Sequence, residues 1–135
     1  MIEIKSTYEG SLRCSSRHGP SGTVIVTDAP VDNHGKGESF SPTDLVATAL
    51  GSCILTTMGI VATMIKVDLS GAQVTVHKEM TSQPPRRIAA LIVTVTIPIE
   101  LNEVQKQKLM KGALGCPVHA SLHPDIQAPI EFIWA

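Results

Sequence analysis

Two cysteines stand in the sequence contexts best suited to chemistry. Cys53 lies inside a long apolar segment, and Cys116 lies 63 positions later in the sequence GCPVH. The reactive form of cysteine is the thiolate, and a free thiol with a pKa near 8.5 is only about 3% ionised at pH 7. Either cysteine therefore needs surroundings that stabilise a negative charge before it can act as a nucleophile.

For Cys53 the surroundings offered by its own segment are unfavourable. Burial disfavours a thiolate, and the start of the predicted helix at Pro42 is about 16 Å away along the axis, beyond the reach of the helix dipole. Lowering a thiol pKa to about 6 requires roughly 3.4 kcal/mol. A reactive Cys53 therefore requires a cation from elsewhere, and Arg13 or Arg17 of the first predicted hairpin can supply it. Otherwise Cys53 is a small core residue.

Cys116 has a different environment, because the sequence predicts that it caps a short helix. Pro117 suits the first helical position, so the sulfur would face free backbone N–H groups. His119 lies three positions further on and is near enough to assist. The alternative, a cap with a surface histidine beside it, stays open.

Motifs for other kinds of site are missing. His119 and His123 are four positions apart, but Pro124 ends the helix there and no third ligand is evident. The sequence contains no GxGxxG, Walker or GxSxG motif. We therefore expect no metal and no nucleotide or other cofactor.

The composition predicts one folded domain over residues 1–135. With 43% hydrophobic residues the chain is too apolar for disorder, and with a net charge of −1 and 3% aromatic residues it lacks a nucleic-acid footprint. The three cysteines are an odd number and form no CxxC pair, which argues against a disulfide scaffold. The first residues alternate apolar and polar side chains, unlike a signal peptide, so we expect a cytoplasmic protein.

A run of 21 uncharged residues, from Leu45 to Ile65, is long enough to span a membrane. Five hydroxyl residues lie inside it and no Trp or Tyr flanks it. The remaining chain contains strands whose apolar faces need a partner. We therefore expect the run to be a buried central helix and expect no membrane contact.

Three groups of elements should position these residues. Strands from Ile2 to about Cys14 and from Thr23 to Asp28 should form a hairpin, followed by an exposed loop, VDNHGKGESF. The central helix should begin with Ser41 as N-cap, Pro42 and Asp44, and should end near Lys66, with Gly51 and Gly59 allowing close packing. The remaining elements are strands 72–78, 88–99 and 130–134, a helix from Asn102 to Gly115, and a short helix in CPVHASL. Strand 88–99 is apolar on both faces, which predicts a central position.

Taken together, SPTDLVATALGSC at residues 41–53 and GCPVH at residues 115–119 resemble the OsmC/Ohr family of thiol-dependent peroxidases. The similarity extends over nearly the whole chain, including GKGESFSP and the strand that ends in Asp-Ala-Pro. The resemblance implies an α+β fold with two sheets around a central helix, in an intertwined homodimer whose active sites lie at the subunit interface.

The resemblance also implies a mechanism. The helix cysteine, Cys53 here, attacks an organic hydroperoxide and becomes a sulfenic acid, and Cys116 then forms a disulfide with it. An external thiol, such as a dihydrolipoyl group, reduces the disulfide. An arginine from the first hairpin normally pairs with the thiolate; Arg13 fits this role, with Arg17 as its rival.

One departure from the family pattern affects the arginine. Well-characterised peroxidases of the family have Glu directly after the helix Pro to hold it, whereas this chain has Thr43 there and Asp44 one position later. Few other charged residues are available near the sulfur, and Glu38 is one of them. The sequence therefore predicts a peroxidase acting on organic hydroperoxides, and the alternative is a non-catalytic binding or redox-sensing protein with an apolar pocket.

Overall fold

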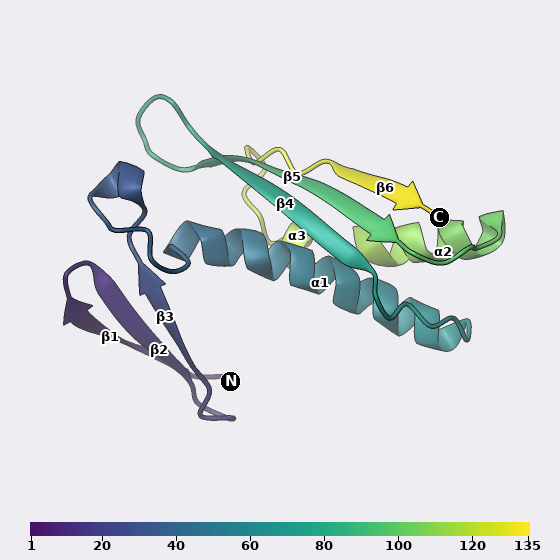
Figure 1. The fold of residues 1–135 in the computed structure, drawn as a ribbon, viewed down its shortest axis with the longest axis horizontal. Coiled ribbons are helices and arrows are strands. Elements are labelled where there is room, and N and C mark those ends of the chain that lie inside the picture. Colours follow the sequence, from purple (N-terminus) through teal and green to yellow (C-terminus); the bar gives the residue numbers. More distant parts are fainter. The chain divides into compact units, whose positions relative to one another are not determined.

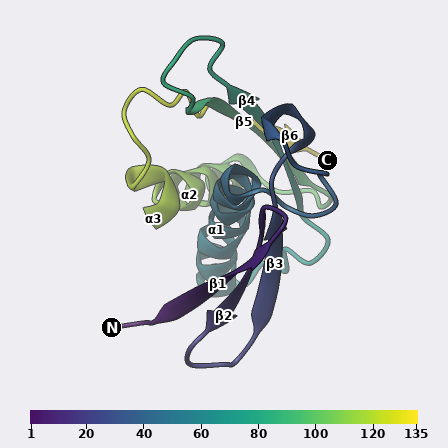
Figure 2. The same cartoon turned by 90° about the vertical axis from the view of Figure 1, so that its left-hand side faces the viewer.

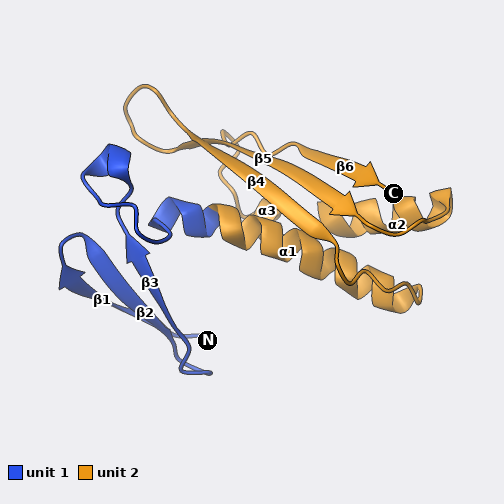
Figure 3. Ribbon diagram, in the orientation of Figure 1, with its two compact units in different colours: residues 1–46 blue, residues 47–135 orange.

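The computed structural model describes all of residues 1–135 as a mixed α+β protein with two three-stranded sheets and three α-helices (Figure 1). This confirms the predicted fold class. The chain forms two compact units, residues 1–46 and residues 47–135 (Figure 3). Each unit is described by itself below.

Unit 1 contains an antiparallel sheet of strand order β1-β2-β3. Its strands are β1 (Ile4–Gly10), β2 (Arg13–His18) and β3 (Val24–Asp28). The prediction of one continuous strand from Ile2 to Cys14 was wrong, because the chain turns back at Ser11 and Leu12. Both residues have positive φ angles, 54° and 61°, directly after Gly10 at 88°. Two consecutive positive φ angles are typical of the tight turns that join antiparallel strands.

The predicted loop after β3 contains one short 3-10 helix, η1 (Val31–Asn33). The helix α1 (Pro42–Met64) then begins where the sequence indicated. Ser41 Oγ accepts a hydrogen bond from the Asp44 N–H at 3.1 Å, and the Asp44 carboxylate accepts one from the Ser41 N–H at 2.9 Å. This reciprocal cap satisfies two backbone donors at the helix start.

Unit 2 contains the sheet β4-β5-β6, in which β5 pairs antiparallel with β4 and parallel with β6. The strands are β4 (Gln73–Met80), β5 (Ile88–Ile97) and β6 (Ile130–Trp134). The central position of β5 is confirmed. One face is buried along the strand, with Leu91, Val93 and Val95 inside, whereas Ile92 and Thr96 of the other face are exposed. The helices of the unit lie on one side of the sheet (Figures 1 and 2) and cover the side chains on that side.

The two remaining helices are α2 (Glu103–Leu114) and α3 (Pro117–Ala120). Asn102 caps α2 in a complete capping box with Gln105, as predicted. Cys116 caps α3, also as predicted. The α2 helix ends at Gly115, so one residue separates the two helices and places Cys116 directly after α2.

Small residues let α1 pack closely against its neighbours in unit 2. A Cβ atom added at Gly51 would lie 3.0 Å from Val74 Cγ1 of β4, and one added at Gly112 of α2 would lie 2.7 Å from Val61 Cγ2 of α1. Gly59 differs from the prediction, because no atom lies within 4 Å of its added Cβ. Close packing therefore occurs on one side of α1 and not on the side of Gly59.

By length and composition alone, α1 could cross a membrane. The structure places one stripe of the helix, which includes Leu50, Ile54 and Met58, in the apolar core. Within its most apolar 18-residue window 33% is buried. The helix is thus a core element on one side, while its other side, with Ile60 and Met64, is uncovered in the single chain.

Candidate active site

Cys53 lies in the middle of α1 and is half-buried. Its position follows Leu50 by three residues and precedes Thr57 by four, so it borders the buried stripe. Thr57 Oγ1 donates hydrogen bonds to the carbonyl oxygens of Cys53 and Ile54, at 3.1 and 3.0 Å. Cys53 is thus held by a regular helix, and the residue is partly exposed.

Cys116 is fully buried at the N-terminus of α3. Its sulfur accepts a hydrogen bond from the His119 N–H at 3.4 Å. Burial raises the pKa of the Cys116 thiol, and its hydrogen bond with Cys53 raises that pKa further. The backbone N–H groups of His119 and Val118 oppose this shift and do not reverse it. Cys116 therefore keeps its proton at neutral pH, because burial outweighs the helix-terminus effect that the sequence indicated.

The two cysteines meet through a hydrogen bond between their side chains. With the proton on Cys116, its thiol donates and the Cys53 sulfur accepts. Both residues lie in unit 2, and neither is part of a disulfide. The structure thus brings together the two thiols that the sequence singled out, across 63 positions of chain.

His119 lies beside Cys116, but the contact is made by its backbone. Its ring atom Nε2 lies 3.3 Å from the carbonyl oxygen of Ala128. No group of three or more His, Cys, Asp or Glu side chains is arranged to hold a metal ion anywhere in the chain. The site in unit 2 is therefore a dithiol with a histidine backbone donor.

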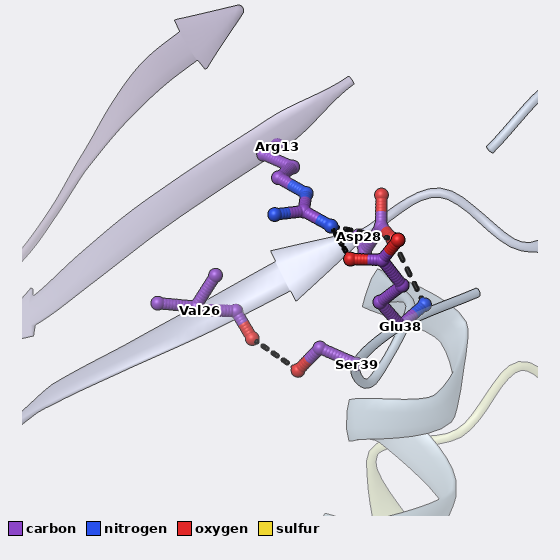
Figure 4. A network of polar contacts seen from close by, with 5 residues as sticks. All are labelled: Arg13, Val26, Asp28, Glu38 and Ser39. Atoms are coloured by element: carbon purple, nitrogen blue, oxygen red, sulfur yellow. Dashed lines mark hydrogen bonds and ion pairs between the residues drawn. The ribbon is translucent and has the colours of Figure 1, made fainter. Parts of the chain in front are cut away.

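In unit 1, Arg13 is part of a network of charged groups (Figure 4). Its guanidinium forms an ion pair with Glu38, and Nη2 lies 3.6 Å from Asp28 Oδ2. The hydrogen bond with Glu38, followed by the charges of Glu38 and Asp28, raises the already high pKa of Arg13. Arg13 is thus a permanent cation held by two acids.

The other predicted residues of unit 1 have different partners. Arg17 Nη1 donates to the Gly22 carbonyl oxygen at 3.3 Å. The Asp44 carboxylate accepts the Ser41 N–H as part of the helix cap. Of the two arginines, Arg13 is the one that forms an ion pair with Glu38. Asp44 is part of the cap at the start of α1.

Sequence reasoning missed Asp28 as a partner of Arg13. The register of the sheet pairs the two residues directly across β2 and β3, and side chains that face each other across strands share one face. Cys14, the neighbour of Arg13 in the same strand, is on the opposite face, and nothing in the structure gives it a role. The misplaced first turn hid this register.

Comparison with known proteins gives a consistent family. The model of the OsmC-like protein family matches residues 35–131. A comparison with curated proteins gives no match. A crystal structure from Psychrobacter arcticus 273-4, described as a candidate osmotic stress induced and detoxification response protein, is 45% identical. The match has a TM-score of 0.92 and covers 98% of this chain and 96% of the Psychrobacter chain.

More distant structures share the fold. The organic hydroperoxide resistance protein OsmC of Legionella pneumophila is 16% identical with a TM-score of 0.77, over 98% of this chain and 96% of that one. A candidate organic hydroperoxide resistance protein of Vibrio cholerae, with captopril in one of its active sites, is 18% identical with a TM-score of 0.77, over 98% and 90%. The family match covers most of the chain, and this protein belongs to the OsmC-like protein family.

Proposed function

We propose that the protein is a thiol-dependent peroxidase that reduces organic hydroperoxides, with Cys53 as the peroxidatic and Cys116 as the resolving cysteine. The observation that carries this proposal is the hydrogen bond between the two free thiols. Two thiols whose side chains contact each other are the partners that a disulfide would join. Family membership supports the redox chemistry, since named relatives include organic hydroperoxide resistance proteins.

The roles of the two cysteines follow from their exposure. Cys53 is half-buried and can meet a substrate, whereas Cys116 is fully buried and stays protonated. The Cys53 thiolate attacks one oxygen of the hydroperoxide, breaking the O–O bond. The sulfur becomes a sulfenic acid and the alkoxide takes up a proton as an alcohol.

Regeneration uses the second thiol and an external reductant. The Cys116 sulfur attacks the sulfenic sulfur, releasing water and forming the Cys53–Cys116 disulfide. Two thiol groups of the reductant, such as a dihydrolipoyl group, then exchange with this disulfide and restore both cysteines while their own sulfurs are oxidised. The captopril in an active site of the Vibrio cholerae relative is itself a thiol and supports access by such a molecule.

Four further residues complete the proposal. Arg13 supplies the cation for the Cys53 thiolate and Glu38 holds its guanidinium; both belong to unit 1. Asp44 acts through the start of α1, and the His119 N–H orders the Cys116 sulfur. The three thiols fit a reducing compartment, so we place the protein in the cytoplasm.

A homodimer is part of the same proposal. The sheet of unit 1 exposes large apolar side chains, with Ile4, Val24 and Val26 among them, and α1 exposes Ile60 and Met64. Apolar surfaces of this kind mark interaction sites in soluble proteins. We propose that a second copy of the chain covers these apolar side chains. Sedimentation of the purified protein tests this proposal.

The reaction is tested by treating the reduced protein with one equivalent of tert-butyl hydroperoxide. Intact mass should fall by two hydrogens, and peptide mapping should give a Cys53–Cys116 linkage. Cys14→Ser is the matched control, because it removes the third cysteine and should give the same product. Two free thiols at positions 53 and 116 after treatment would overturn the proposal, and oxidation without reduction by dihydrolipoate would favour a redox sensor.

A further inference from the structure

The acid network around Arg13 contains one buried and one exposed carboxylate. Asp28 is 1% exposed and Glu38 is 58% exposed, while the Arg13 side chain between them is 37% exposed. Water screens a charge at Glu38 far more than a charge at Asp28. The two acids therefore hold the same cation in different ways.

Asp28 organises the network through its two oxygen atoms. Its Oδ2 accepts the N–H of Glu38 at 2.9 Å and lies 3.6 Å from Arg13 Nη2 (Figure 4). Its Oδ1 is buried without a hydrogen-bond partner. A guanidinium has five N–H donors in a fork that matches a carboxylate, so the open acceptor of Asp28 is suited to an N–H of Arg13.

The segment that carries Glu38 is fastened to the end of β3. The Asp28 N–H donates to the Phe40 carbonyl oxygen at 3.0 Å, and Ser39 Oγ donates to the Val26 carbonyl oxygen at 3.0 Å. Together with the bond from the Glu38 N–H to Asp28, these contacts fix residues 38–40 against the strand. Asp28 thus holds Arg13 directly and also holds the backbone of the other acid.

We propose that Asp28 is the positioning residue of Arg13, and that Glu38 is its exchangeable partner. The acid at the start of α1, Asp44, accepts the Ser41 N–H in the helix cap. The role of Arg13 toward Cys53 rests on the proposed function. The ordering of the Arg13 guanidinium by Asp28 does not.

Three single variants separate the two acids. Asp28→Asn removes the buried charge and keeps an oxygen that can accept the Glu38 N–H. Glu38→Gln removes the exposed charge. Glu9→Gln is the matched control, because it removes a charge from an exposed residue of the same sheet.

The first measurement is independent of activity: NMR of the arginine guanidinium groups in the reduced full-length protein, with the Arg13 signal assigned by its loss in Arg13→Lys. We expect Asp28→Asn to abolish the slowed rotation and slow hydrogen exchange of Arg13. Glu38→Gln and Glu9→Gln should retain both. A guanidinium that stays ordered in Asp28→Asn, or loses its order in Glu38→Gln alone, would overturn the inference.

The second measurement is the rate of Cys53 oxidation by tert-butyl hydroperoxide. We expect Asp28→Asn to lower this rate about tenfold, because it removes a charge from a buried ion pair. Glu38→Gln should lower the rate by less than about threefold, because its ion pair is exposed. In an Arg13→Ala background Asp28→Asn should cause no further loss, whereas a purely structural role would give additive losses. If Arg13→Ala itself oxidises at the wild-type rate, the proposed role of Arg13 fails, and the NMR result still decides the role of Asp28.

Discussion

The dithiol of unit 2 and the arginine network of unit 1 are built on opposite principles. Around Cys116 no charged side chain takes part: burial keeps the thiol protonated, and its partners are another thiol and backbone N–H groups. Around Arg13 three charged side chains meet, and two of them are substantially exposed. Packing therefore keeps the Cys116 thiol protonated, whereas acidic side chains hold the Arg13 cation.

The two regions can therefore contribute different steps to the reaction of a peroxidase. A buried dithiol is well placed to form a disulfide but cannot by itself stabilise a thiolate. An exposed cation held by acids can stabilise a thiolate but performs no redox step. The proposed function needs both, and each of the following predictions tests one side of the comparison.

The largest effect is expected from the cysteines themselves. Cys53→Ser should abolish peroxide reduction, because a serine hydroxyl is not ionised at neutral pH. Cys116→Ser should still consume about one equivalent of peroxide and then stop, because the sulfenic acid at Cys53 has no resolving thiol. Stopped-flow consumption of tert-butyl hydroperoxide, with mass spectrometry of the product, measures both.

If Cys53 and Cys116 have the proposed roles, Cys53→Ser and Cys116→Ser should give different products. Trapping with dimedone should label Cys53 in Cys116→Ser after peroxide treatment and should label nothing in Cys53→Ser. Sustained turnover by Cys116→Ser would mean that the buried thiol is not the resolving residue. Cys14→Ser serves again as the control with full turnover.

The next effect concerns the two arginines of β2. Arg13→Ala should lower the rate of Cys53 oxidation about 10- to 100-fold, equivalent to about 1.4–2.7 kcal/mol. Arg17→Ala removes the same charge from a residue whose guanidinium donates to the Gly22 carbonyl, and its effect should be below about threefold. The alkylation rate of Cys53 with iodoacetamide is a second readout that needs no peroxide. Equal losses in both variants would show a general field of positive charge instead of a specific partner.

A smaller effect concerns the packing that holds the dithiol in unit 2. Gly112→Ala would place a Cβ atom 2.7 Å from Val61 Cγ2, so it should lower the free energy of unfolding by about 1–3 kcal/mol. Gly59→Ala meets no atom within 4 Å and replaces a poor helix former, so it should raise that free energy by up to about 1 kcal/mol. Urea unfolding of both variants measures the difference.

The Gly59→Ala variant also tests the proposed dimer. If a second copy packs closely on this side of α1, the added methyl group should weaken association although it favours the helix. Sedimentation equilibrium of Gly59→Ala separates the two effects. A variant that is less stable and remains fully dimeric would contradict the open space seen at Gly59.

Several elements could be predicted because a local signal fixed them. Ser41 with Pro42, Asn102 with Gln105, and Cys116 with Pro117 each begin a helix where predicted, since caps depend on residues three positions apart. The meeting of the two cysteines depends on tertiary packing, and only the family resemblance indicated it.

The parts that were missed depend on register and on partners. The turn at Ser11 and Leu12 lacks the usual Asn-Gly signal, so the first strand was extended through it. Without that turn the register of β2 against β3 cannot be assigned, so the pairing of Arg13 with Asp28 could not be predicted. A shift of one residue moves a side chain to the other face of the sheet. The apolar residues on both faces of β5 predicted its central position, but they do not tell which face the helices cover.

The smallest predicted effect is a pH dependence that comes from Cys116 alone. Because its pKa is raised in the folded protein, the folded state binds more protons than the unfolded state between the ordinary and the raised value. The stabilisation is therefore fully present below the ordinary thiol pKa, about 8.5, and is lost as the pH rises through the folded value. Stability should fall with increasing alkalinity, the opposite of a cysteine activated by a cation.

Urea unfolding between pH 7 and pH 10, in the presence of a reductant, isolates this contribution when wild type is compared with Cys116→Ser. Serine does not titrate in this range, so the free energy of unfolding should fall less steeply in the variant, while other groups contribute equally to both. A parallel decline would mean that burial does not control the Cys116 thiol. A steeper decline in the variant would reverse the sign and mean that the fold stabilises the thiolate form of Cys116.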